Sequence, residues 1–121
     1  DDTIFRLDDA WHTVNAKADL GGSHVETSAA GASATATAKG RRYLLLARTG
    51  PTSGKLSVLL GHHRIRTIDL FSSAPGHKVF DLYGGAGTKR ASRTFTFRCT
   101  GNHGPFSSGS TVELDGLSVL R

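Results

Sequence analysis

Cysteine, methionine, tryptophan and long apolar runs are scarce or absent in this chain of 121 residues. Cys99 is the single cysteine, so an intrachain disulfide cannot form. No apolar run approaches the ~18 residues of a membrane span, and no charged-then-apolar signal segment opens the chain. We therefore expect no membrane partner. Methionine is absent even from position 1, which indicates either a domain excised from a longer protein or a processed product.

Helical patterns are missing as well. Apolar residues make up 37% of the chain, against roughly 45–50% in an average domain. The 15 glycines, with many Ser, Thr and Ala residues, take their place. No window keeps apolar residues at helical spacing over about three turns. The length suits one domain with a core of its own, so we predict a single domain over residues 1–121.

Alternation with a period of two residues recurs along the chain and predicts β-strands. In RTFTFRC the residues Phe95, Phe97 and Cys99 share one face, and in ASATATAKG one face carries only alanine methyl groups. Clusters of Gly, Ser, Pro and Asn separate the predicted strands. Short strands with turn signals at about 8- to 12-residue spacing indicate an all-β sandwich or barrel. We predict an all-β sandwich.

The C-terminal segment TVELDGLSVL changes its alternation at Asp115–Gly116. Val112 and Leu114 share one parity, whereas Leu117 and Val119 share the other. Asp-Gly is a strong signal for a two-residue hairpin turn, but the arms of such a hairpin would be very short. We therefore favour one long strand with a β-bulge that resets the alternation.

Two adjacent histidines, His62 and His63, stand in the stretch GHHRIRTIDLF together with Asp69. Neighbouring residues of a regular strand point to opposite faces, so both histidines could bind one metal ion only from a turn. We predict an exposed turn at residues 61–63 that leads into a strand. In that strand Ile68 and Leu70 face inward.

Catalytic motifs are not found. The chain contains no Gly-x-Ser-x-Gly, no His-Glu-x-x-His, no Cys-x-x-Cys and no EF-hand loop. Carboxylates such as Asp69, Asp81, Glu113 and Asp115 have no spacing that pairs them for glycoside hydrolysis. We predict that the chain is not an enzyme.

A few residues are candidates for ligand contacts. Trp11 is either a platform on which a sugar ring stacks or a core residue that anchors the first strands. Tyr83 borders a glycine-rich loop, which makes it the better platform. The long loop at residues 101–110 contributes Asn102 and His103 as hydrogen-bonding groups, since loops on a rigid scaffold commonly carry binding sites.

The charge balance is basic, with 15 Lys and Arg residues against 10 Asp and Glu residues and a net charge of +5. A basic chain suits an anionic partner. Nucleic-acid binding needs exposed aromatic residues beside the charge, and the aromatics here are few and mostly at core positions. We therefore expect no nucleic-acid partner and favour an acidic glycan over a neutral one.

The order of these elements resembles that of a secreted bacterial β-sandwich module. The matching segments, in chain order, are AWHTV, LGGSHVETSAAGASATATAKGRRYLLLA, TGPTSGKLSVLLGHHRIRTIDLFSS, RTFTFRCTG and GSTVELDGLSVL. They run from about Asp9 to Leu120. Such modules are jelly rolls of the galactose-binding-like type, similar to carbohydrate-binding modules appended to secreted enzymes of bacteria, actinobacteria in particular.

The resemblance implies a jelly-roll β-sandwich of two antiparallel sheets with eight to ten strands. It also implies a non-catalytic accessory domain that binds carbohydrate on a secreted or cell-surface protein, next to other domains of a larger chain. As an isolated domain it is expected to be a monomer. The alternative is a structural or protein-interaction module that positions a neighbouring domain and binds no sugar.

The resemblance also suggests a metal site. In some relatives a closing aspartate helps to bind a structural calcium together with two N-terminal acidic residues. Asp115 occupies the closing position, and the segment LDDAW supplies Asp8 and Asp9 where relatives carry Glu-x-Glu. Asp115 and Asp9 are therefore the candidate calcium ligands, and no other cofactor is expected. His62 and His63 replace an Asp-Gly of the relatives, so the resemblance assigns them no role.

Overall fold

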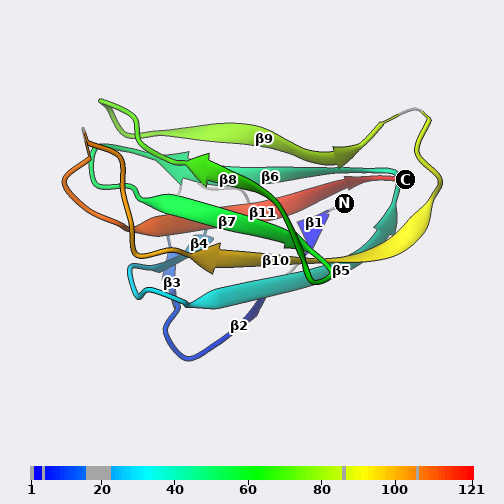
Figure 1. The fold of residues 1–121 in the computed structure, drawn as a ribbon, viewed down its shortest axis with the longest axis horizontal. Coiled ribbons are helices and arrows are strands. Elements are labelled where there is room, and N and C mark those ends of the chain that lie inside the picture. Colours follow the sequence, from blue (N-terminus) through cyan, green and yellow to red (C-terminus); the bar gives the residue numbers. More distant parts are fainter. Residues whose placement is uncertain (1, 4, 16–22, 86, 106) are drawn as a thin grey trace.

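A computed structural model describes residues 2–3, 5–15, 23–85, 87–105 and 107–121. The described part of the chain folds into two antiparallel sheets that pack face to face (Figure 1). The first sheet has the order β3-β4-β11-β6-β9, with β1 paired to β11, and the second has the order β2-β5-β10-β7-β8. The bounds of the first sheet are β1 (Asp2–Thr3), β3 (His12–Asn15), β4 (Ser23–Thr27), β6 (Arg42–Thr49), β9 (Gly76–Gly84) and β11 (Val112–Leu120). Those of the second are β2 (Arg6–Leu7), β5 (Ser33–Gly40), β7 (Lys55–Leu60), β8 (His63–Asp69) and β10 (Ala91–Cys99).

The predicted fold class is confirmed. Nine of the described strands have four residues or more, and β1 and β2 add two short pairings of two residues each. None of the described residues belongs to a helix that is long and apolar enough to cross a membrane.

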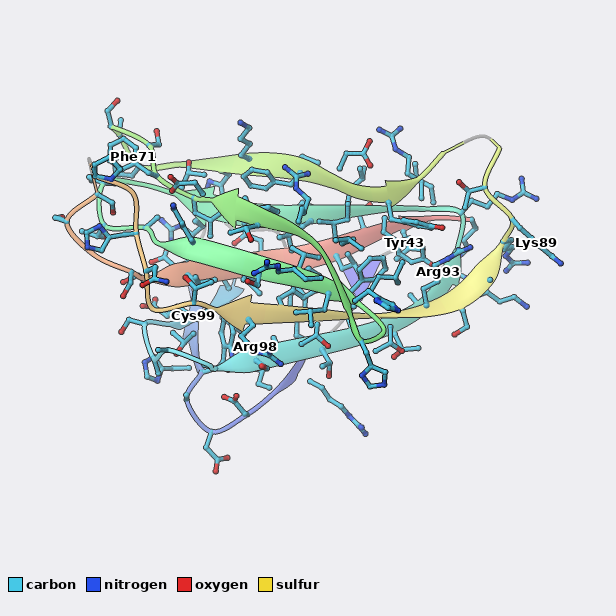
Figure 2. The ribbon with its side chains drawn as sticks, viewed as in Figure 1. Tyr43, Phe71, Lys89, Arg93, Arg98 and Cys99 are labelled. Carbon is cyan, nitrogen blue, oxygen red and sulfur yellow. The ribbon has the colours of Figure 1, made fainter. Side chains whose placement is uncertain are left out.

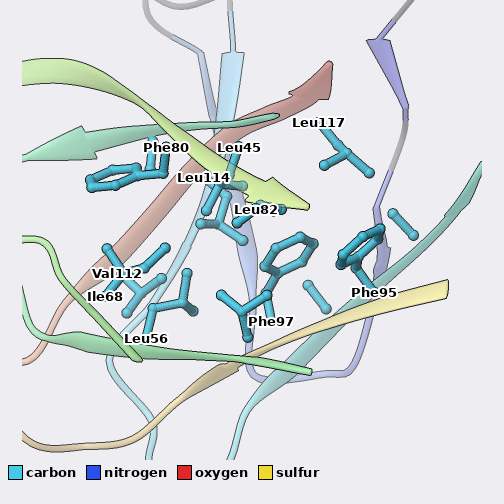
Figure 3. Packing of buried hydrophobic residues seen from close by; sticks show 14 of the residues in the cluster. Leu45, Leu56, Ile68, Phe80, Leu82, Phe95, Phe97, Val112, Leu114 and Leu117 are labelled. Atoms are coloured by element: carbon cyan, nitrogen blue, oxygen red, sulfur yellow. The ribbon is translucent and has the colours of Figure 1, made fainter. Parts of the chain in front are cut away.

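The core lies between the two sheets and is built from the residues that the alternation placed inward. Phe95, Phe97 and Cys99 of β10 are fully buried and belong to one core cluster. Figure 3 shows Phe95 and Phe97 in this cluster with Leu45 of β6 and Leu114 of β11. Ala34 and Ala36 of β5 are also buried, and Ala38 is partly buried. Their small side chains leave room for the large aromatic rings, since protein interiors are packed to nearly constant density.

The break in alternation in β11 is a β-bulge, as predicted. β11 runs as one strand along β6, and the register shifts between Leu114 and Gly116. Both Leu114 and Leu117 are completely buried, although they differ in parity. One extra residue in the strand turns the following side chains back to the core face, so apolar burial selects the bulge over the hairpin.

The turn at the two histidines also follows the prediction. Gly61 adopts a positive φ of 62°, His62 completes the turn, and both His62 and His63 are exposed. Ile68 and Leu70 are buried.

The connections lie at two opposite ends of the sandwich (Figure 1). One end holds the β5–β6 turn, the β9–β10 loop and the last residue of β11. The other end holds the loops that precede β7, follow β8 and precede β11.

Candidate functional site

Tyr83 is the exposed aromatic residue of the first of these ends. It lies one residue before the end of β9, and 38% of it is exposed. The Arg93 guanidinium lies over the Tyr83 ring, 5.1 Å from its centroid, and 5.8 Å from the centroid of the Tyr43 ring. Arg93 also donates to the carbonyls of Gly40 (2.8 Å) and Lys89 (2.9 Å). A cation fixed by two carbonyls holds the Tyr83 ring in place through cation–π attraction.

Tyr43 makes this end rigid from inside. Its ring is fully buried and packs at 4.8 Å from the Phe95 ring. Its hydroxyl is 2.8 Å from the carbonyl of Ala38 and 2.9 Å from that of Ala91. Tyr43 belongs to the first sheet, whereas those two carbonyls belong to the second, so one side chain joins both layers beneath the site (Figure 2).

Charged residues lie near Tyr83 along the first sheet, since Arg42 pairs with Gly84 and Asp81 lies two residues before Tyr83 in β9. Arg42 Nη2 lies 2.8 Å from Asp81 Oδ2, and Arg66 donates to the Asp81 carbonyl at 2.7 Å. The Arg42 and Asp81 side chains are about half exposed, so this ion pair contributes little to stability. Arg42 and Asp81 alternate with buried neighbours, so the pair lies on the outer face of the first sheet, whereas Tyr83 pairs with the buried Tyr43.

Asn102 and His103 lie at the opposite end of the sandwich from Tyr83. Tyr83 pairs with Tyr43 near the start of β6, whereas the loop of Asn102 and His103 contacts the chain just beyond the end of β6, through Ser107 and Pro51. Thr49 lies six positions after Tyr43 in β6, which is about 20 Å of strand. The structure therefore does not bring Tyr83 together with these two candidate loop residues.

The loop that carries Asn102 and His103 is well anchored. The Ser107 hydroxyl lies within hydrogen-bonding distance of three carbonyls, that of Ser53 nearest at 2.7 Å. His103 Nδ1 lies 2.8 Å from the Gly104 carbonyl, which can only accept, so Nδ1 carries the proton. In the neutral ring this leaves Nε2 as an acceptor on an exposed side chain. Asn102 is also exposed, so the two residues form a separate polar surface.

Trp11 is not a sugar platform. Its exposed fraction is 7%, and it belongs to the core cluster between the sheets. A ring buried in this way cannot offer a face to a pyranose, so the other interpretation, a core residue that anchors the first strands, is the right one. The indole has a large apolar area, and the sequence signal for core and for platform is therefore the same.

Asp115 and Asp9, the candidate calcium ligands, lie in different environments. Asp115 is almost completely buried, and its Oδ2 lies 3.4 Å from Nε2 of His77. Asp9 is exposed in the turn after β2, while Asp8 accepts hydrogen bonds from the backbone amides of Ser33 and Ala10. The metal-like grouping among the described residues is a different one, which the sequence did not reveal. It consists of His24, Glu26 and Glu113, whose ligand atoms lie within 4.8 Å of one another.

This cluster contains its own cation, the Arg48 side chain. Arg48 Nη1 lies 3.3 Å from His24 Nδ1, and Arg48 Nε lies 3.4 Å from Glu113 Oε2. A guanidinium only donates, so His24 Nδ1 accepts and its Nε2 donates to Glu26 at 3.1 Å. Calcium prefers six to eight oxygen ligands, whereas this set offers an imidazole and a fixed positive charge. The residues of this cluster do not fit calcium.

Cys99 carries no reactive thiol. It is completely buried, and its Sγ lies 3.5 Å from the carbonyl of Ser110. Burial raises the pKa of the Cys99 thiol above its ordinary value, and a backbone hydrogen bond at Gly101 lowers it by a smaller amount. The thiol therefore stays protonated at neutral pH and is a poor nucleophile.

Comparison with solved structures identifies the fold. A family 35 carbohydrate-binding module from Clostridium thermocellum matches with a TM-score of 0.61 at 13% identity, over 97% of this chain and 92% of that one. A family 36 carbohydrate-binding module in complex with calcium and xylotriose matches with a TM-score of 0.57 at 10% identity, over 94% and 92%. The chain has the jelly-roll fold of carbohydrate-binding modules.

A third match lies within a much larger protein. A Paenibacillus xanthan lyase matches with a TM-score of 0.73 at 18% identity, over 95% of this chain. This chain spans only 12% of that lyase. Neither a family model nor a curated protein matches the sequence.

Proposed function

We propose that this chain is a non-catalytic accessory domain that binds carbohydrate as a monomer. It would belong to a secreted or cell-surface protein with further domains. The fold is that of carbohydrate-binding modules, and two of the matching structures are such modules over nearly their whole length. The observation that carries the proposal is Tyr83, an exposed aromatic ring held in place by the Arg93 guanidinium.

The binding mode follows from this arrangement. A pyranose would stack on the face of Tyr83 that Arg93 does not cover, because the apolar C–H face of a sugar complements an aromatic ring. The platform is pre-organised by the inter-sheet bonds of Tyr43, so little conformational entropy is lost on binding.

Asn102 and His103 would form an independent contact surface for glycan at the other end. Their exposed side chains stand on a loop that Ser107 anchors. A glycan that bound there would not contact Tyr83, so variants at the two ends separate the two surfaces.

A hydrolase is the less favoured reading. Glu26 and Glu113 approach each other, but Glu26 already contacts His24 and Glu113 already contacts Arg48. A shallow groove of about 340 Å³ lies instead on the outer face of the second sheet, over Thr35, Thr37 and Thr94. No carboxylate lines this groove, so it lacks the acid–base pair that glycoside hydrolysis needs.

A glycan array distinguishes carbohydrate binding from the alternative of a purely structural module. We expect the chain to bind at least one glycan, and Tyr83→Ala to weaken that binding about tenfold, the loss from an aromatic contact worth about 1.4 kcal/mol. Val79→Ala is the matched control, since Val79 is 55% exposed on the same strand. Binding that survives Tyr83→Ala but is lost in His103→Ala would move the site to the other end. Failure to bind any glycan would favour the structural module.

A further inference from the structure

The end of the sandwich that carries Tyr83 concentrates the positive charge of the chain. Seven of the 15 Lys and Arg residues lie there, on and beside the β5–β6 turn, in the loop before β10, at the start of β10 and at the C-terminal residue. They are Lys39, Arg41, Arg42, Lys89, Arg90, Arg93 and Arg121. We call this group the basic end.

The fold, rather than the sequence order, brings these residues together. Gly40 pairs with Ala91 across β5 and β10, and Arg42 pairs with Gly84 across β6 and β9. The Arg41 amide donates to the Leu120 carbonyl at 2.8 Å, which places the C-terminal residue beside the same turn. Figure 2 shows Tyr43, Arg93 and Lys89 together at this end.

Few of the side chains that the structure describes at the basic end carry negative charge. Among the described side chains Asp81 is its one carboxylate, and it already contacts Arg42 through its side chain. The other described acidic side chains lie toward the opposite end, near Ser33, the end of β8 and the start of β11. Among the described side chains, charge is therefore not spread evenly over the surface.

Four of the cations are available for a ligand. Lys39, Arg41, Lys89 and Arg90 are exposed, and their side chains form no ion pair or hydrogen bond with any residue that the structure describes. Like charges held close together repel each other and produce a potential of several kT. An anionic ligand relieves this repulsion, whereas a neutral one does not.

We propose that the ligand of the Tyr83 site is a polysaccharide with anionic groups along its chain, and that Lys39, Arg41, Lys89 and Arg90 bind those groups. This inference rests on the proposed function. Tyr83 binds one sugar ring, and the cations beside it bind carboxylates or sulfates of that ring and its neighbours. Guanidinium and ammonium groups bind both kinds of anion.

A glycan fits this end better than a nucleic acid does. Single-stranded nucleic acids bind to surfaces on which successive bases stack on several aromatic residues. Tyr83 is the one aromatic residue among the exposed large apolar side chains that the structure describes. A single aromatic platform flanked by cations suits a polysaccharide in which one sugar ring stacks on the platform and the neighbouring sugars carry charge.

The test compares the same polymer with and without its charge. Isothermal titration calorimetry on the 121-residue chain uses polygalacturonate, its fully methyl-esterified form, alginate and hyaluronate. Heparin tests whether sulfate groups are bound, and a DNA duplex tests whether a nucleic acid is bound. We expect a carboxylated or a sulfated polymer to bind at least tenfold more tightly than esterified pectin. We also expect that affinity to fall as NaCl rises from about 50 to 500 mM, because salt screens exposed charges.

Two double variants locate the contact. Lys89→Gln with Arg90→Gln removes two charges from the basic end, and we expect about a fivefold to twentyfold loss of affinity. Arg6→Gln with Lys55→Gln removes the same charge elsewhere and is expected to leave the affinity unchanged. Circular dichroism confirms that both variants fold.

Several results would overturn the inference. If esterified and charged polymers bind equally, the Tyr83 site is a neutral glycan site and the proposed function survives alone. Equal losses in both double variants would show attraction by net charge rather than by this end. Preferential binding of DNA would replace the glycan with a nucleic acid. Binding of no polysaccharide at all would refute the proposed function itself.

Discussion

Replacing Tyr43 with phenylalanine removes one hydroxyl group and leaves the buried ring in place. That hydroxyl lies 2.8 Å from the Ala38 carbonyl and 2.9 Å from the Ala91 carbonyl. Both carbonyls belong to the opposite sheet, so the variant removes a polar link between the layers without opening a cavity as large as a side chain.

The expected loss follows from the burial of the site. A typical hydrogen bond contributes about 0.5–1.5 kcal/mol net, and a buried group left without its partner costs about 1–3 kcal/mol. Tyr43 is completely buried, so we expect Tyr43→Phe to lower the free energy of unfolding by about 1–2 kcal/mol. In a domain of this size that loss lowers Tm by roughly 3–10 °C.

Chemical unfolding in urea, followed by tryptophan fluorescence from buried Trp11, measures this loss. Tyr83→Phe is the matched control, because Tyr83 is partly exposed and its hydroxyl forms no hydrogen bond with a described residue. We expect that control to change stability by less than about 0.5 kcal/mol. Equal stabilities of Tyr43→Phe and the parent chain would refute the reasoning that this hydroxyl joins the sheets.

Two further predictions concern Cys99 and calcium. Because the pKa of the Cys99 thiol is raised on folding, the folded state holds its proton at pH values where the unfolded thiol, with an ordinary value of 9.0, has lost it. The free energy of unfolding is therefore expected to fall as pH rises above about 9. Urea titrations at several pH values measure this fall, and Cys99→Ala is expected to make it less steep. A pH dependence that Cys99→Ala leaves unchanged would contradict the role given to this thiol. If Asp115 and Asp9 bind calcium, calcium chloride raises the free energy of unfolding by about 2.7 kcal/mol at a hundredfold excess over Kd. Asp115→Asn is then expected to abolish this stabilisation. A Tm that does not respond to calcium or to EDTA would rule that site out.

The sequence predicts the strands well because one face of a strand packs against the apolar core and the other face contacts water. In β10, Phe95, Phe97 and Cys99 are buried, and Thr94 and Arg98 between and beside them are exposed. The bulge at Asp115–Gly116 could be anticipated for the same reason, since only an extra residue lets both halves of the strand bury their leucines.

The candidate site could be predicted only in part. Tyr83 lies beside a glycine-rich loop, and this local signal is enough to indicate it as a candidate platform for a sugar ring. Trp11 has no local signal that separates a core ring from an exposed one, and the structure buries it. The cluster of His24, Arg48 and Glu113 comes from three strands that pair only in the folded sheet, so no spacing along the chain reveals it.

The sequence by itself determined the all-β class, the inward faces of the strands and the basic balance of charge, because alternation and composition are local properties. Only the tertiary structure decided where that charge lies and which candidates meet. Antiparallel pairing brings residues far apart in sequence, such as Gly40 and Ala91, side by side, and sends loops that lie closer in sequence to opposite ends. Tyr83 was therefore separated from Asn102 and His103, and joined to cations from the β5–β6 turn and the loop before β10.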